Sequence, residues 1–379
     1  MLGLAENLPS EFRNAFISFS EDGRCADFLN RAEKRGFHAR MLRFDTPRLI
    51  SSLHELTVLL RDFETDILCC RGYKANLVGR LAARKIGIPV FAVSHGWTSE
   101  NLKVRAYEAL ECFGFRFMDR VVCVSQSQAE KVCRKGIARE RVVTIPDAVQ
   151  TNRFAHPDPT YRQVLRRFFA RPPSRIVGAA GRLSREKGFG ILVEAAARLK
   201  RTNPDIGFVL FGEGVLRHKL AQQITARGLD ETFVLAGFRS DLDQFLPHLD
   251  LVALPSFTEG LPNVVLEAFA AAVPVVASAV GGTPEIVRSG ENGLLVPPGN
   301  PEALAQAIRN MFASESRCKE MGRSGRELIR ERFTFKAQSL AYQELLKGLV
   351  SQPDGLREHQ AQDSYPLSAT EYLAIAGKK

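Results

Sequence analysis

Short apolar runs alternate with longer stretches of mixed character along most of the chain. The runs are rich in Val, Ile, Phe and Leu, and they occupy residues 15–19, 67–70, 90–93, 121–124, 142–145, 176–180, 208–211, 233–236, 251–254, 275–277 and 294–296. Such runs predict buried parallel strands when the segments between them are long enough for crossover helices. The pattern occurs in two sets, separated by residues 152–174. In this segment, four prolines and several arginines interrupt both the strand pattern and the helix pattern. The sequence therefore predicts an α/β protein with two Rossmann-like domains.

The expected domain organisation follows from these interruptions. An N-terminal Rossmann-like domain covers residues 1–155, a linker 156–174 and a C-terminal Rossmann-like domain 175–334; a helix at 335–350 returns toward the first domain, and a flexible tail covers 351–379. The first domain begins with a helix-like segment at 2–8 that leads directly to strand 15–19. A doubly wound domain normally opens with a strand and a glycine-rich turn. We therefore expect the first domain to lack its opening strand.

Composition excludes several classes of protein. The chain has 379 residues, of which 45% are hydrophobic and 25% charged, as in soluble proteins. Its longest apolar stretch, 264–280, is interrupted by Glu267 and Pro274, and no export signal opens the chain, so a cytoplasmic location is expected. The seven cysteines are scattered without a CxxC pair and predict reduced core residues. A net charge of +10 favours anionic partners.

One loop concentrates positive charge at the predicted edge of a sheet. The segment Gly178–Gly188 contains the end of strand 176–180 and the turn after it. Arg182 and Lys187 lie on this turn, where the carboxyl ends of parallel strands form ligand sites. A fork-shaped arginine beside a lysine binds a diphosphate and stabilises it as a leaving group. Taken alone, the same residues also fit a solvated basic loop.

A second segment carries two carboxylates. Glu259 lies on the loop after strand 251–254, and Glu267 lies inside the helix that follows. Pro262 suits the first turn of that helix because its missing N–H needs no partner there. The amides from Gly260 to Val264 then face an anion or a hydroxyl group. Each glutamate alone also fits a surface position or a helix N-terminus.

Together these motifs resemble glycosyltransferase family 4, which has the GT-B fold. The resemblance covers residues 14–346 and rests on the Gly-Arg-Leu…Glu-Lys-Gly motif and on the Glu-x7-Glu spacing of Glu259 and Glu267. Further matching stretches are Gly72–Asn76, Ser94–Trp97, Asp119–Ser125, Gly212–Gly214, Gly237–Phe238 and Gly281–Glu285. The resemblance implies a retaining transferase that uses a nucleotide diphosphate sugar, with front-face attack assisted by the leaving phosphate.

The resemblance also implies roles for individual residues. Arg182 and Lys187 would bind the donor diphosphate, Glu259 a sugar hydroxyl and Glu267 the ribose hydroxyls. His95, after strand 90–93, would face the transferring sugar from across the cleft. The other donor-binding residues implied are Gly212, Phe238, Arg239, Gly260, Leu261, Pro262, Asn263 and Val264. Phe238 fits a base-binding segment or, alternatively, a core position.

No cofactor or metal is expected. Asp241 and Asp243 have the spacing of a metal-binding Asp-x-Asp pair, but they open a predicted helix, where they are interpreted as capping residues. The Gly212-Glu213-Gly214 turn also resembles a dinucleotide fingerprint, but Arg217 occupies the position of the third glycine. This disfavours an NAD-dependent oxidoreductase.

The expected partners are a nucleotide-sugar donor and a glycan or lipid-linked acceptor of lipopolysaccharide or other polysaccharide synthesis. The basic and aromatic segment Tyr161–Arg175 predicts either a helix at the domain hinge or a peripheral contact with the inner membrane leaflet. Nucleic acid is disfavoured because the basic residues are dispersed. Because the opening strand is expected to be absent, a catalytically impaired nucleotide-sugar-binding remnant remains the alternative.

Overall fold

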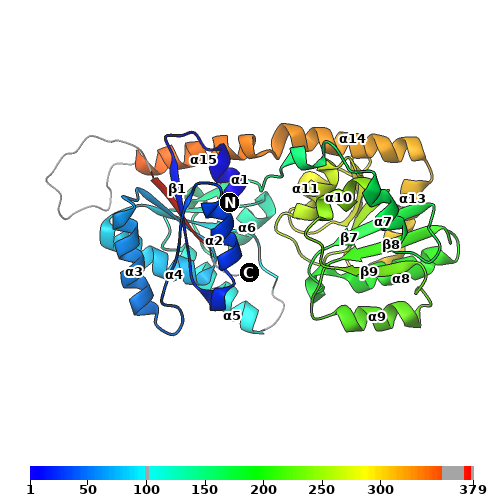
Figure 1. Cartoon of the computed structure of the whole chain (residues 1–379), viewed down its shortest axis with the longest axis horizontal. Coiled ribbons are helices and arrows are strands. Elements are labelled where there is room, and N and C mark those ends of the chain that lie inside the picture. Colours follow the sequence, from blue (N-terminus) through cyan, green and yellow to red (C-terminus); the bar gives the residue numbers. More distant parts are fainter. Residues whose placement is uncertain (99–101, 352–370, 377–379) are drawn as a thin grey trace. The chain divides into compact units, whose positions relative to one another are not determined.

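The structure is a computed structural model that describes residues 1–98, 102–351 and 371–376 (Figure 1). It divides into two compact units. Unit 1 comprises residues 1–146 together with the C-terminal segment from residue 335, and unit 2 comprises residues 147–334. The division falls after Pro146 rather than after residue 155, and the segment predicted as a linker belongs to unit 2.

Residues 156–174, which were predicted as a linker, are held to unit 2 by their apolar side chains. Helix α7 (Thr160–Arg166) buries Leu165, and Phe169 just beyond it is also buried. The Tyr161 ring packs edge-on against the Phe245 ring at a centroid distance of 4.9 Å. Because these apolar groups are already covered, the segment offers little surface for insertion into a lipid leaflet.

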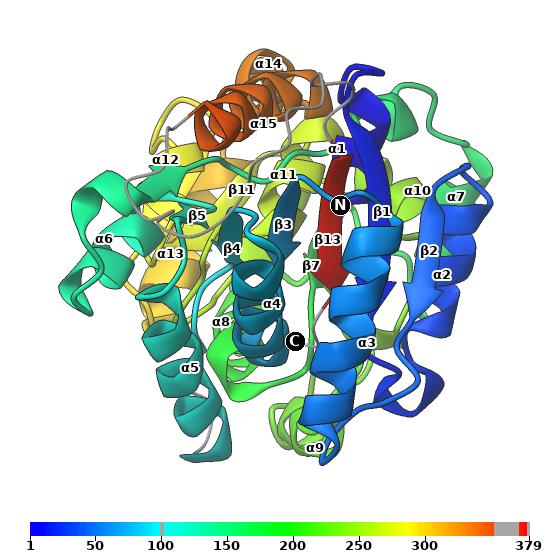
Figure 2. The same cartoon turned by 90° about the vertical axis from the view of Figure 1, so that its left-hand side faces the viewer.

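Unit 1 is a parallel sheet covered by helices on both faces. Its strand order is β2-β1-β13-β3-β4-β5-β6 (Figure 2). The strands are β1 (Arg13–Ser18), β2 (His38–Met41), β3 (Ile67–Cys70), β4 (Val90–Ser94), β5 (Arg120–Cys123), β6 (Val142–Thr144) and β13 (Glu371–Ala376). The helices include α1 (Leu2–Asn7), α2 (Ala26–Glu33), α3 (Leu49–Asp62), α4 (Tyr73–Ile86), α5 (Leu102–Phe115), α6 (Gln126–Arg134) and α15 (Phe335–Val350).

Alternate residues of the unit 1 strands enter two separate cores. Ile17, Leu68 and Ala92 pack in one cluster with residues of α3 to α6. Phe16 and Phe91 pack in the other with residues of α1, α2 and α15. This two-sided burial explains why the strands have continuous apolar runs instead of alternating ones.

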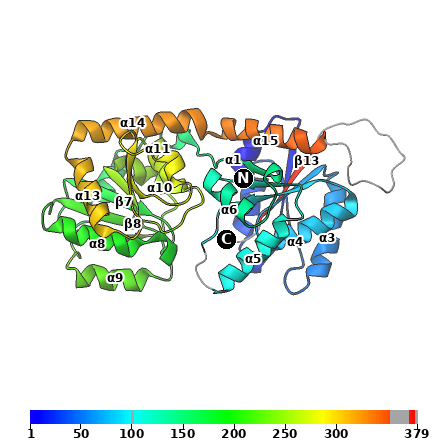
Figure 3. The ribbon, with the colours of Figure 1, turned by 180° about the vertical axis from the view of Figure 1, so that it is seen from behind.

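Unit 2 is a second parallel sheet, with strand order β12-β11-β10-β7-β8-β9. Its strands are β7 (Arg175–Ala180), β8 (Ile206–Phe211), β9 (Phe233–Gly237), β10 (Leu251–Leu254), β11 (Val275–Ser278) and β12 (Gly293–Val296). Helices α8 (Phe189–Lys200) and α9 (Arg217–Ala226) cover one face, and α11 (Asn263–Ala270) and α14 (Glu315–Arg332) cover the other (Figure 3). The remaining helices include α10 (Leu242–Phe245), α12 (Thr283–Ile286) and α13 (Pro301–Phe312).

Two strands were not expected from the sequence. β2 lies at the edge of its sheet and buries only Ala39 of its four residues, so it has no apolar run. β13 lies in the segment expected to be a flexible tail, and for Glu371–Ala376 that expectation was wrong. Residues 352–370 and 377–379 of the same predicted tail lie outside the described residues. The overall composition of residues 351–379 predicts a flexible tail, but composition does not show that a short stretch pairs with strands far away in the sequence.

Two predictions from composition can be compared with the described residues. All seven cysteines are free thiols, and five of them are buried. Burial raises the pKa of Cys123 to about 12, so this thiol stays protonated. Within the described ranges, no helix has the length and apolar character needed to cross a membrane.

Candidate active site

The turns after β7, β8, β10 and β11 are joined by backbone hydrogen bonds at the carboxyl edge of the unit 2 sheet. The Leu183 amide donates to the Glu213 carbonyl at 2.9 Å, and the Phe257 amide donates to the Glu186 carbonyl at 2.7 Å. The Gly282 amide donates to the Gly260 carbonyl at 3.0 Å. This edge is where doubly wound sheets bind ligands. The predicted site residues of unit 2 lie on its turns, except for Asn263, Val264 and Glu267, which lie on helix α11 after β10.

Gly188 sets the close approach between two of these turns. It has a φ of +63°, and a Cβ at this position would lie 2.2 Å from the carbonyl oxygen of Pro255. Both the left-handed backbone and the contact require glycine. Gly188 is also the N-cap of α8, which begins at Phe189, so the basic loop ends where this helix starts.

Replacing Gly188 with alanine should lower the free energy of unfolding of unit 2 by roughly 3 kcal/mol, because backbone strain and a steric clash add together. Gly290→Ala is the matched control, since Gly290 has a φ of +90° and a Cβ there would meet no atom within 4 Å. Hydrogen exchange of the β7 and β10 amides would measure both effects. Equal losses in the two variants would contradict the clash with Pro255.

Lys187 and Glu259 form an ion pair between the turns after β7 and β10. Lys187 Nζ lies 2.7 Å from Glu259 Oε1, and the Ser256 hydroxyl donates to the same oxygen at 2.7 Å. The Glu259 side chain is 8% exposed and that of Lys187 is 23% exposed. The sequence predicted both residues for the site, and the structure brings them into direct contact.

Arg182 is oriented by a buried carboxylate that the sequence analysis did not single out. Its guanidinium donates to Glu186 Oε1 at 2.7 Å, and the Ser184 hydroxyl donates to the same oxygen. Burial acts to raise the pKa of Glu186, but the hydrogen bonds from Ser184 and Arg182 outweigh it and lower this pKa below its ordinary value. Half of the Arg182 side chain remains exposed. Glu186 therefore stays ionised and holds the guanidinium at the loop.

Glu267 lies on α11, close to a second ion pair. Arg153 contacts Asp243 through two nitrogens, at 3.2 and 2.9 Å. The pKa of Glu267 is raised to about 7, mainly by burial; the positive charge of Arg153 opposes this shift, and the negative charge of Asp243 adds to it. The pairing of Arg153 with Asp243 could not be predicted from the sequence, because the two residues are 90 positions apart. The site thus contains a carboxyl group that titrates near neutrality.

The start of α11 differs slightly from the prediction. Pro262 precedes the helix as its N-cap, and Asn263 is the first helical residue. Leu261 and Pro262 are buried, whereas Asn263 is exposed. The amides of Asn263 and Val264 belong to the first turn, where helix geometry provides no intrahelical acceptor.

The turn after β9 corrects two interpretations. Phe238 is 74% exposed, so the core alternative was wrong. Asp241 is the N-cap of α10, but its side chain makes no capping hydrogen bond. It instead accepts two hydrogen bonds from Arg239, at 2.9 and 2.8 Å, and one from the Tyr161 hydroxyl at 3.1 Å. Among the described residues, no cluster of three or more potential metal ligands is found.

In unit 1, His95 directly follows β4 at the carboxyl edge of that sheet. The turn that carries it is held by α5: the Trp97 indole donates to Glu111 at 2.9 Å, and the Thr98 amide donates to Glu108 at 2.7 Å. Ser94 accepts a hydrogen bond from Gln128 at 2.9 Å. The His95 backbone is therefore fixed from both sides.

A second polar group occupies the same edge of unit 1. Lys74 Nζ lies 2.8 Å from Asp45 and 3.8 Å from Glu21, and the Tyr73 and Tyr107 rings stack at 4.4 Å. Burial and the neighbouring Tyr107 raise the pKa of Tyr73 to about 12. We call Glu21, Asp45 and Lys74 the edge cluster. Tyr73 and Lys74 lie in a stretch that matches the family, but nothing in the sequence identifies Glu21, Asp45 and Tyr107 as their partners.

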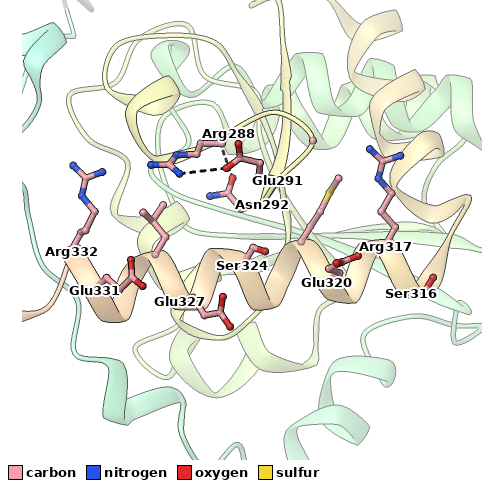
Figure 4. A pocket seen from close by; sticks show the side chains of 13 residues that line it. Arg288, Glu291, Asn292, Ser316, Arg317, Glu320, Ser324, Glu327, Glu331 and Arg332 are labelled. Carbon is pink, nitrogen blue, oxygen red and sulfur yellow. Dashed lines mark hydrogen bonds and ion pairs between the residues drawn. The ribbon is translucent and has the colours of Figure 1, made fainter.

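A pocket of about 590 Å³ lies elsewhere in unit 2, along α14 and the turn before β12 (Figure 4). It is lined by charges of both signs, including Arg288, Glu291, Arg317, Glu320 and Glu327. None of the residues predicted for the site contributes to its wall. The pocket lacks the excess of positive charge that a diphosphate needs.

Two protein families match this chain, and together the matched segments span most of its residues. Residues 2–153 match the family described as Glycosyltransferase Family 4, and residues 163–328 match the family described as Glycosyl transferases group 1. The first match falls mainly in unit 1 and the second lies within unit 2.

Individual proteins match over most of their length. The chain is 32% identical over 282 residues to the GDP-mannose-dependent alpha-(1-6)-phosphatidylinositol monomannoside mannosyltransferase of Mycolicibacterium smegmatis, covering 72% of this chain and 73% of that protein. It is 27% identical to the UDP-Gal:alpha-D-GlcNAc-diphosphoundecaprenol alpha-1,3-galactosyltransferase of Escherichia coli, covering 80% and 81%. The solved structure of Anabaena HepE in complex with UDP is 22% identical, with a TM-score of 0.76, and covers 89% of this chain and 100% of that one. This structural likeness concerns the fold alone.

Proposed function

Because this chain belongs to glycosyltransferase family 4 and has the GT-B fold, we propose that it transfers a sugar from a nucleotide diphosphate sugar to a glycan or lipid-linked acceptor, with retention of anomeric configuration. The Lys187–Glu259 pair carries this proposal, since it places a cation for a phosphate beside a carboxylate for a sugar hydroxyl. The names of two relatives include a phosphatidylinositol mannoside and a diphosphoundecaprenol-linked sugar. They support a lipid-linked acceptor, and we propose that the reaction belongs to polysaccharide or lipopolysaccharide synthesis.

The donor would bind at the carboxyl edge of unit 2. Arg182 and Lys187 supply positive charge for the diphosphate, and the first-turn amides of α11 supply hydrogen-bond donors. Glu259 accepts a hydrogen bond from a sugar hydroxyl, and Glu267 accepts from the ribose. Phe238 is exposed beside Arg239 and is available to contact the base.

Transfer requires stabilisation of the departing nucleotide. Negative charge grows on the diphosphate as the glycosidic bond breaks, and preorganised cations stabilise that charge without rearrangement. Lys187 and Arg182 perform this role in our proposal, so no divalent metal is required. His95, at the fixed end of β4 in unit 1, would hydrogen-bond the transferring sugar, and the edge cluster would contact acceptor hydroxyls. The acceptor hydroxyl attacks the sugar from the face that the nucleotide leaves and gives its proton to the departing phosphate, so the configuration is retained.

Binding and transfer can be measured separately. Calorimetry with UDP, GDP and ADP and their common sugar conjugates, without added metal, is expected to show binding of one nucleotide class. Incubation with that donor and lipid-linked or free glycan acceptors should then yield a product whose anomeric configuration, read by NMR, matches that of the donor. An inverted product would contradict retention. Donor binding without transfer to any acceptor would favour the catalytically impaired alternative.

Donor affinity should depend on the ionisation of Glu267. Its pKa in the free protein is raised to about 7, and hydrogen bonds from ribose hydroxyls favour the ionised form, so donor binding should lower this pKa and release protons. Affinity should therefore rise as pH increases from about 5 to 7, by about tenfold for each pH unit by which the pKa falls. A nucleotide sugar is the suitable ligand, because its diphosphate diester does not titrate in this range.

Calorimetry in buffers of different ionisation enthalpy would count the released protons. The control is Glu267→Gln, which should bind donor more weakly and without this pH dependence. Glu267 also affects the free energy of unfolding. Its pKa in the folded protein lies above the ordinary value of 4.5, so the stability that the protonated carboxyl contributes is lost as pH rises through about 7. Proton release that persists in Glu267→Gln would locate the titration elsewhere.

A further inference from the structure

The last strand of the chain, β13, lies in the middle of the unit 1 sheet. β13 is parallel to both of its neighbours and lies between them (Figure 2). Arg13–Ser18 of β1 pair with Glu371–Ala376 on one side, and Ile67–Cys70 of β3 pair with Tyr372–Ile375 on the other. In the described part of the sheet, β13 is the strand that connects β2 and β1 to β3 and the strands beyond it.

We propose that the C-terminal strand, residues 371–376, acts within its own chain as a complementing strand that joins the two halves of the unit 1 sheet and thereby assembles the edge cluster. One half is β2-β1, and the other is β3-β4-β5-β6. This inference concerns unit 1 alone and does not depend on the donor proposed for unit 2.

The edge cluster draws its members from both halves. Glu21 follows β1 and Asp45 follows β2, whereas Lys74 lies in the first turn of α4, after β3. The contacts of Lys74 with Asp45 and Glu21 therefore connect the two sides of β13, as does its position 5.3 Å from the centroid of the Phe19 ring. Neighbouring strands are about 4.8 Å apart, so β1 and β3 are held about 10 Å apart with one strand between them. Without β13, backbone pairing would no longer fix that spacing.

The sheet is more stable with a strand between β1 and β3 than with that position empty. Empty, it would expose unpaired backbone groups on β1 and on β3, both of which are otherwise buried central strands. Ile17 and Leu68 are fully buried at this point in the sheet. A gap would expose them to water or draw in a strand from another molecule.

The strand can reach its position within one chain. Helix α15 ends at Val350 and buries Leu346 and Leu349 in the same core as Ile67 and Phe91. Residues 351–370 connect it to β13, and 20 extended residues span up to about 66 Å, far more than the width of a small sheet. A tethered strand is present at an effective concentration in the millimolar range, which favours it over a second copy.

Hydrogen exchange tests the proposal on the full chain. In the unaltered protein, the amides of Tyr372–Ile375 are expected to be protected like those of β3, and exchange at the rate of an unfolded peptide would overturn the proposal. Leu373→Pro removes a ladder donor and should speed exchange in β1 and β3 by about 100-fold or more, while β7 and β10 of unit 2 stay protected. Leu367→Pro, the same change upstream of the strand, should leave β1 and β3 unaffected. Unchanged protection in Leu373→Pro would also overturn the proposal.

A dilution series separates a strand from the same chain from one supplied by a second copy. If β13 comes from the same chain, protection of β1 and β3 is independent of protein concentration, and analytical ultracentrifugation gives the same mass throughout. Protection that falls on dilution, together with dissociation of a dimer, would overturn the assignment to the same chain. If Leu373→Pro fails to fold, shown by loss of β7 and β10 protection as well, the two measurements on the unaltered protein still decide the question.

Discussion

Replacing Lys187 with alanine is expected to lower kcat by about 10² to 10³-fold, the usual cost of removing one preorganised group that stabilises developing charge. Two effects combine in this variant. The diphosphate loses a cation as the sugar departs, and Glu259 loses its partner at 2.7 Å while its side chain is only 8% exposed. The affinity for the nucleoside diphosphate should also fall, because the product carries the full charge that Lys187 stabilises. Steady-state kinetics and calorimetry measure the two quantities.

The controls distinguish the charge of Lys187 from its contribution to folding. Lys319→Ala removes an exposed lysine that pairs with Glu315 one helical turn away, and it should change neither kcat nor nucleotide affinity. Lys187→Arg keeps the charge with a different shape and should recover part of the nucleotide affinity. If Lys187→Ala binds the nucleoside diphosphate as well as the unaltered protein does, the proposed location of the diphosphate is wrong.

Most of the parallel strands were predictable because their residues are buried on both faces. β3 is the clearest case: all four residues of Ile67–Cys70 are buried, and the apolar run has the same limits. β2 shows the opposite, since at the edge of the sheet only Ala39 is buried and local hydrophobicity falls. β13 depends on pairing with strands more than 300 residues away, and local composition cannot reveal such a partner.

The site was predictable where its residues lie in one short motif. Arg182 and Lys187 share a turn, and Glu259 follows another strand of the same sheet, so the strand pattern predicts all three at one edge. That β7 and β10 are neighbours comes from the structure. Glu186 lies within the same motif, yet nothing in the spacing indicated that it would be buried against Arg182. The Arg153–Asp243 pair joins positions 90 residues apart, and the opposite charges of two distant residues do not identify them as partners.

The Lys187–Glu259 contact makes the two residues interdependent, which affects how substitutions at either one are interpreted. The Ser256 hydroxyl also donates to Glu259 Oε1, so two donors converge on a single oxygen. Oε2 is then the oxygen that remains for a sugar hydroxyl in our proposal. A double-mutant cycle of Lys187 and Glu259 would measure the coupling, because each residue changes the environment of the other.

Replacing Glu259 with alanine is expected to lower kcat by about 10²-fold while the affinity for the nucleoside diphosphate changes by less than about threefold. The reason is that the glutamate contacts the sugar, which the nucleoside diphosphate lacks, whereas Lys187 keeps its charge for the phosphates. Affinity for the intact nucleotide sugar should fall in the same variant. Glu302→Ala is the matched control, since Glu302 is 70% exposed and pairs with Arg198 at the surface.

The role of Glu259 follows from comparing how the substitution changes the affinity for the nucleoside diphosphate and the affinity for the nucleotide sugar. If the variant loses affinity for the nucleoside diphosphate as strongly as for the nucleotide sugar, Glu259 acts only by positioning Lys187, and the sugar must be bound by other residues. If only the sugar-dependent part is lost, the carboxylate contacts the transferred group. Glu259→Gln refines the result: the amide oxygen still accepts a hydrogen bond, but the ion pair with Lys187 is gone, so recovery of kcat by glutamine would show that hydrogen bonding rather than charge supports transfer.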